Sequence, residues 1–84
     1  MKEAERRQAI IKAVIRSLAQ ERARQGMSRN ALAAKAGISQ SVVSRLESGV
    51  SLNPTIDSML RIADALSVDL GDLLVVAAKG QGGH

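Results

Sequence analysis

This chain of 84 residues lacks several residue types on which disulfides, metal sites and aromatic cores depend. It contains no cysteine, so neither disulfides nor thiolate metal sites can stabilise it. It has no phenylalanine, tryptophan or tyrosine, and its core must therefore consist of Leu, Ile, Val, Met and alanine. Side chains this small favour short helices packed closely together. The one histidine, His84, stands at the C-terminal end, where a lone ligand cannot make a metal site.

Long apolar segments and the groups needed for acid-base catalysis are also missing. No stretch approaches a membrane span or a signal-peptide core, so we expect a cytoplasmic protein with no membrane partner. No pair of carboxylates accompanies a histidine or lysine in an arrangement suited to proton transfer. The glycines near the C-terminus follow no strand and precede no helix, so they form no phosphate loop. We therefore expect no enzyme, no cofactor and no metal.

The charge of the chain is basic and unevenly distributed. Lys and Arg total 12 and Asp and Glu total 8, which gives a net charge of +4. Residues 1–55 hold ten of the basic and four of the acidic side chains, whereas residues 56–84 hold two and four. This balance fits a polyanionic partner on the N-terminal part, although a modest positive charge is also common on proteins that never bind nucleic acid.

Two short helices joined by a tight turn are predicted in the middle of the chain. Ser28 can cap a helix over residues 29–36, because its hydroxyl can accept a hydrogen bond from an amide of the first turn. Gly37 ends that helix, since glycine takes the left-handed conformation without steric penalty. Ser39 then caps a second helix over residues 40–47. Small alanines in the first helix allow the two to cross closely, as a helix-turn-helix requires.

Three further helices are predicted, over residues 3–25, 56–66 and 70–77. We expect an all-α fold, a compact five-helix bundle with an extended first helix. The domain spans residues 1–78 with its helix-turn-helix at 28–48, and residues 79–84 have the composition of a flexible tail. The first of these helices carries an apolar stripe wider than one packing seam needs, so part of it could face a partner chain or only cover the back of the bundle; its residues are Ile10, Ile11, Val14, Ile15 and Leu18. The positions expected to face inward in the other two helices are Ile56, Met59, Leu60, Ala63, Leu66, Leu73 and Leu74.

The outward side of the helix over residues 40–47 has an unusual composition. A solvated helix face is usually filled with Glu and Lys. This one carries Gln40, Ser41, Val42, Ser44 and Arg45. Gln can bond adenine, Arg can bond guanine, Ser can serve either, and an aliphatic group can pack on the thymine methyl. The alternative is that the first two residues only begin the helix and that the arginine is a solvated surface charge.

The motif continues on both sides of this helix. Leu32-Ala33, Gly37-Ile38-Ser39, Val43-Ser44-Arg45-Leu46-Glu47 and Gly49 precede Asn53-Pro54 and the segment Leu60 to Leu66. The combination resembles the phage repressor and Cro-like helix-turn-helix family, also called XRE-type regulators, over residues 18–74. The resemblance implies a lambda-repressor-like DNA-binding domain that binds double-stranded DNA.

The resemblance also implies roles for individual residues. The family reads bases with the first, second, third and sixth residues of this helix, which here are Gln40, Ser41, Val42 and Arg45. It contacts phosphate at the start of the preceding helix and near the following loop, and the matching residues are Arg29 and Asn30, with Ser44, Ser51 and Asn53 in second rank. Any of these last three could instead be a turn or cap residue. The apolar Val50 and Leu52 depart from the basic or polar residues common in that loop.

A structural ion pair and a dimer interface complete these expectations. Arg22 and Glu47 match a partly buried pair of the family that orients the recognition helix; the alternative is two unpaired surface charges. Because one recognition helix reads few base pairs, we expect a homodimer. Surplus apolar surface lies on the Ile11 and Ile15 side of the first helix and near the C-terminus, and the resemblance favours the second region, Leu70, Leu74, Val75 and Val76.

The expected function is a transcriptional regulator, in which the homodimer occupies a pseudo-palindromic operator. The alternative class is a protein-binding module, for example an antitoxin, whose main role is to bind a partner protein and which binds DNA for autoregulation. The wide apolar stripe of the first helix and the segment after Val75 could serve such a partner.

Overall fold

The computed structural model describes residues 2–50 and 53–81, and within these ranges the regular structure is entirely α-helical. The predicted all-α fold with an extended first helix is confirmed. The helices are α1 (Glu3–Arg24), α2 (Arg29–Ala36), α3 (Gln40–Glu47), α4 (Ile56–Ala65) and α5 (Leu70–Gln81).

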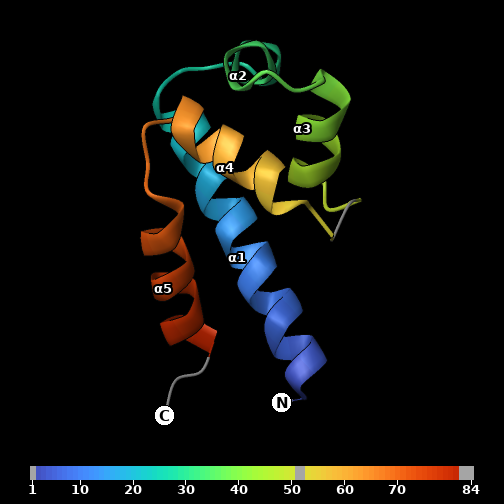
Figure 1. Ribbon diagram of the computed structural model, residues 1–84, viewed down its shortest axis with the longest axis vertical. Helices are drawn as coiled ribbons and strands as arrows, with labels where there is room; N and C mark the ends of the chain where they lie inside the picture. The colour runs from blue at the N-terminus through green and yellow to red at the C-terminus, as the bar shows by residue number, and fades with distance from the viewer. Residues whose placement is uncertain (1, 51–52, 82–84) are drawn as a thin grey trace.

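The long helix α1 organises the molecule. In Figure 1, α1 and α5 run side by side along the long axis, α2 lies across one end, and α3 and α5 lie on opposite sides of α1. Helix α2 packs against both α3 and α4, and α1 also packs against α3. The result is an elongated domain with principal extents of 38 × 22 × 19 Å, in which α3 lies at one side of the bundle.

The ends of α2 and α3 follow from local side-chain chemistry. The Ser28 hydroxyl accepts a hydrogen bond from the Ala31 amide at 3.0 Å, and the Ser39 hydroxyl accepts one from the Val42 amide at 3.4 Å. Gly37 has a φ of 72°, and a Cβ there would meet the Arg61 guanidinium at 3.2 Å. A substitution at this turn would therefore be strained in its backbone and crowded by α4. Helices α2 and α3 thus begin and end at the residues predicted.

The other predicted helix starts have the same kind of cap. The Thr55 hydroxyl accepts a hydrogen bond from the Ser58 amide at 3.0 Å, and the Asp69 carboxylate accepts one from the Asp72 amide at 3.1 Å. Each cap satisfies an amide that has no partner inside its own helix. Gly26, which has a φ of 71°, follows the last turn of α1 as predicted.

The core joins all five helices and contains no buried polar side chain among the described residues. Its most deeply buried members are Val14, Leu32, Val43 and Leu66, each less than 2% exposed. Around them lie Ile15, Leu18, Ala33, Ala36, Leu46, Met59, Ile62, Ala63, Ala65, Leu70 and Ala77. Aliphatic and alanine side chains therefore fill the core, as the absence of aromatic residues predicted.

The prediction for α4 was wrong at two positions. Ile56 is 62% exposed and Leu60 is 46% exposed, although both were expected to face inward. The buried seam is instead Met59, Ile62, Ala63 and Leu66, spaced at i, i+3, i+4 and i+7. This seam covers one side of the helix, and Ile56 and Leu60 lie on its flank.

Helix α5 differs from its prediction in length and in which face is buried. It continues to Gln81, so residues 79–81, expected in the flexible tail, are helical, while residues 82–84 lie outside the described residues. Leu70 was expected in the dimer interface, but it is only 5% exposed and belongs to the core, so it is not available there. Leu74, expected to close the bundle, is 36% exposed and lies at the edge of the buried face. Ile15, on the alternative interface, is also buried.

Candidate nucleic-acid interface

Helix α3 presents a row of polar side chains to solvent. Gln40, Ser41 and Arg45 are exposed, whereas Val42 is half buried and packs against the core. Val43 and Leu46 fix the opposite side of the helix in the core. Three of the four side chains predicted to contact bases are therefore exposed, and Val42 offers only part of its surface.

Hydrogen bonds within α3 hold part of this row in place. The Gln40 amide nitrogen donates to the Ser44 hydroxyl at 2.8 Å, and the hydroxyls of Ser39 and Ser41 lie 3.1 Å apart. Arg45 forms no ion pair with any described residue. Its guanidinium keeps all its donors available, whereas Gln40 must reorient or extend its bonding to reach a base edge.

A cluster of three charged residues ties α3 to the rest of the domain. Arg22, at the end of α1, donates from Nε to Glu47 Oε2 at 2.7 Å and from Nη2 to Oε1 at 2.9 Å. Arg22 Nη1 also donates to the Met27 carbonyl at 2.7 Å. Arg29, at the start of α2, donates from Nε to Glu47 Oε1 at 2.9 Å. The carboxylate at the end of α3 is thus held by the helices on both sides of it.

Burial makes this cluster more than a surface contact. The side chain of Glu47 is 8% exposed and that of Arg22 is 17% exposed, while Arg29 is 49% exposed. Burial acts to raise the pKa of Glu47, but the hydrogen bonds and charges of Arg22 and Arg29 outweigh it and the pKa is lowered. The hydrogen bonds that Arg22 donates to Glu47 raise the pKa of Arg22. Glu47 is therefore an anion at neutral pH, with both cations in bonding contact.

The predicted phosphate contacts lie in different surroundings. Asn30 and Asn53 are exposed, and Arg29 keeps half of its side chain exposed while bonded to Glu47. Ser44 is half buried and accepts the bond from Gln40, so it is less accessible than expected. Ser51 lies outside the described residues.

Sequence reasoning missed two contacts near this interface. It assigned Arg29 to phosphate alone, although Arg29 also binds Glu47. Nothing in the sequence signals that the Glu47 carboxylate is buried or that it has a second partner. It also gave no role to Gln25, whose amide nitrogen donates to the Leu66 carbonyl at 2.8 Å and ties the end of α1 to the end of α4.

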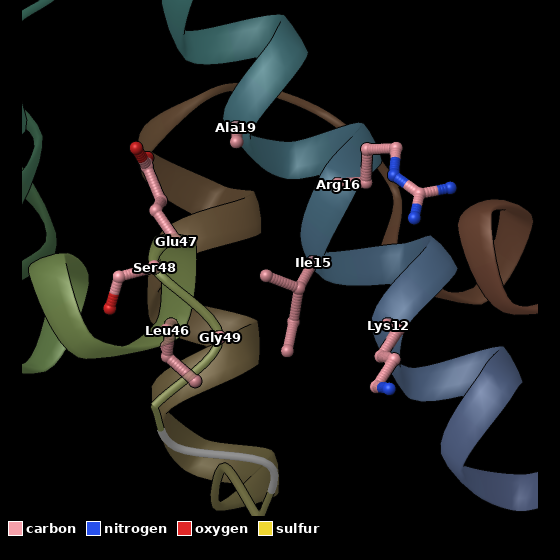
Figure 2. A pocket seen from close by; sticks show the side chains of 8 residues that line it. All are labelled: Lys12, Ile15, Arg16, Ala19, Leu46, Glu47, Ser48 and Gly49. Carbon is pink, nitrogen blue, oxygen red and sulfur yellow. The ribbon is translucent and has the colours of Figure 1, made fainter.

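A hollow of about 340 Å³ lies between α1 and the C-terminal end of α3. Figure 2 shows Ile15 pointing from α1 toward Leu46, and these two side chains form the apolar floor of the hollow. The remaining lining residues are Lys12, Arg16 and Ala19 of α1 and Glu47, Ser48 and Gly49 at the end of α3. Sequence reasoning noted an excess of positive charge in α1 but assigned no role to Lys12 or Arg16.

The outward face of α5 combines two valines with one residue of each charge. Val75 is 54% exposed and Val76 is 70% exposed. Asp72 and Lys79 are also exposed. Together with the valines they occupy positions i, i+3, i+4 and i+7, which lie on one face of a helix. Leu74 lies on a different side of the helix, at the edge of the buried face, and is 36% exposed.

Other kinds of site were sought within the described ranges. No three acidic or histidine side chains there come together in a way that could hold a metal ion. Of the helices at 2–50 and 53–81, none has the length and apolar character needed to cross a membrane.

Comparisons with known proteins agree with this geometry. The family model described as "Helix-turn-helix" matches residues 18–73, more than half of the chain. The HTH-type transcriptional regulator SlrR of Bacillus subtilis (strain 168) is 38% identical over 52 residues. That match covers 62% of this chain but only 34% of the regulator, so the chain spans about a third of its relative's length. No solved structure matches the chain.

Proposed function

Since the chain belongs to the helix-turn-helix family, we propose that it is a sequence-specific double-stranded DNA-binding transcriptional regulator. The observation that carries the proposal is the row Gln40, Ser41 and Arg45, which is exposed on α3 and suited to base edges. The regulator to which the chain is similar supports the same role. A binding domain of this kind performs no covalent chemistry, so the proposed activity is not enzymatic.

The proposed mechanism is occupation of an operator. Helix α3 enters the major groove, and the start of α2 with Arg29 and Asn30 faces the phosphate backbone, where helix amides and their dipole favour an anion. The Arg22, Glu47 and Arg29 cluster fixes the angle of α3. Arg29 therefore has two roles in this proposal, since it can donate to Glu47 from Nε and to a phosphate from its terminal nitrogens.

The test separates base contacts from backbone contacts. Binding sites are first selected from a random pool of duplexes. Replacing Arg45 by Ala is expected to weaken binding to the selected site by about 1–3 kcal/mol and to leave binding to unrelated duplex nearly unchanged. Replacing Arg29 by Ala is expected to weaken both and to flatten the salt dependence. A loss that is equal on all sequences for Arg45→Ala would refute the base-reading role.

We further propose that the protein binds DNA as a homodimer through the outward face of α5. In a two-fold antiparallel pairing of two α5 helices, Val75 meets Val76 of the second copy at the axis, and Val76 meets Val75 of that copy. Asp72 then faces Lys79 of the second copy, because the midpoint of that pair in the sequence coincides with the midpoint of the valines. The operator is then a pseudo-palindrome with half-sites roughly 34 Å apart. Leu70, which is buried, holds α5 against the core, and Leu74 lies outside the proposed contact.

A further inference from the structure

The hollow between α1 and the end of α3 has an uncompensated positive edge. Lys12 and Arg16 stand one turn apart on α1 and are both exposed. Neither is in an ion pair with a described residue, whereas Arg22, Arg24, Arg29 and Arg61 all are.

The acidic group of the hollow cannot neutralise this edge. Glu47 is the only carboxylate among the described lining residues, and its oxygens already accept hydrogen bonds from Arg22 and Arg29. The nearby groups are thus four cations and one anion, and the two cations without a partner lie on α1. Such an edge attracts an anion rather than an apolar partner.

The location of the hollow indicates which anion. Its second wall, Leu46 to Gly49, is the C-terminal end of α3 and the turn that follows. When a recognition helix occupies the major groove, which is about 12 Å wide, the phosphates of the two strands lie on either side of the helix. One strand faces the start of α2. We expect the other strand to pass the turn after α3, beside the part of α1 that carries Lys12 and Arg16.

We propose that Lys12 and Arg16 bind phosphate groups of the DNA strand that passes the turn after α3. The inference rests on the proposed function and deepens it, because the extended α1 adds a backbone contact outside the helix-turn-helix. Contacts of this kind position a protein on the duplex and carry no sequence information. They also give a role to the positive charge that α1 contributes to the N-terminal part of the chain.

The experiment measures binding against salt for Lys12→Ala, Arg16→Ala and the double variant, on the selected duplex and on an unrelated one. Each phosphate contact contributes about 0.9 to the slope of log affinity against log salt. The double variant should therefore lose nearly two from the slope on both duplexes. The ratio of the DNA affinity of the unsubstituted protein to that of the double variant should fall about tenfold between roughly 50 and 200 mM salt.

Two controls make the result specific. Lys35→Ala removes the same charge from the last turn of α2, outside the residues that line the hollow, and should leave the slope unchanged. Alanine at exposed helix positions preserves the helix, and circular dichroism verifies the fold of each variant. Arg29→Ala serves as the positive control for a phosphate contact.

Three outcomes would overturn the inference. If Lys12→Ala and Arg16→Ala keep the full slope while Arg29→Ala lowers it, α1 makes no backbone contact and the proposed function stands. If the α1 variants weaken only the selected duplex, the residues do not bind phosphate in the manner proposed. If the unsubstituted protein binds no duplex at all, the proposed function fails, and this inference fails with it.

Discussion

Glu47 is the residue on which the orientation of α3 depends most, and its removal should cost more stability than that of either arginine. Its carboxylate is 8% exposed and accepts hydrogen bonds from two helices. Removing one partner of a buried ion pair costs about 3–5 kcal/mol, because the other charge stays buried without compensation. Arg22 is 17% exposed and keeps its hydrogen bond to the Met27 carbonyl. The loss of unfolding free energy in Glu47→Ala should therefore lie at the low end of this range, about 3 kcal/mol.

Arg22→Ala should cost less, about 2 kcal/mol, because Glu47 keeps its bond to Arg29. The double variant leaves no buried charge unpaired, so its loss should be about 2 kcal/mol smaller than the sum of the two single losses. A domain of this size has a total stability of about 4–13 kcal/mol, so each of these changes is measurable.

Urea unfolding followed by far-ultraviolet circular dichroism is the suitable assay, since the chain has no aromatic residue for fluorescence. The exposed pair of Arg24 and Glu21 provides a matched control cycle, whose coupling should be much smaller because solvent screens the two charges. Single losses at Arg22 and Glu47 that add to within about 0.5 kcal/mol would refute the reasoning, because they would show that the two charges do not stabilise each other in the folded protein.

Two further predictions concern acid and assembly. Because the folded-state pKa of Glu47 lies below its ordinary value of 4.5, its contribution is complete above that value and is lost as the pH falls below it. Hydrogen bonds from Arg24 and Gln25 lower the pKa of Glu21 to about 2, so the contribution of Glu21 is lost as the pH falls from 4.5 through about 2. Glu47→Gln should therefore flatten the fall in unfolding free energy below pH 4.5, and an unchanged acid profile would contradict this assignment. For assembly, Val76→Asp should shift sedimentation toward monomer, whereas Asp72→Lys combined with Lys79→Asp should restore the pairing that either change alone weakens. Unchanged sedimentation of Val76→Asp would remove α5 from the interface.

The sequence alone determined where the helices begin and where the helix-turn-helix lies, because both depend on chemistry within a few residues. A cap hydroxyl lies three residues from the amide that it binds, as at Ser28, Ser39 and Thr55, and Gly37 ends α2 by its own backbone conformation. These contacts need no knowledge of distant segments. The same is true of the polar row on α3, which follows from helical spacing once the helix is placed.

Tertiary structure decided which sides of α4 and α5 are buried, because an apolar stripe wider than one seam does not say which of its members meet the core. Ile56 and Leu60 lie outside the seam of α4, and Leu70 lies inside that of α5. The second partner of Glu47 and the hollow beside Lys12 were also out of reach, since each arises where segments distant in the chain come together. Helical periodicity fixes positions around one axis, and only the packing of α1 against α3 and α5 fixes how those axes are turned toward one another.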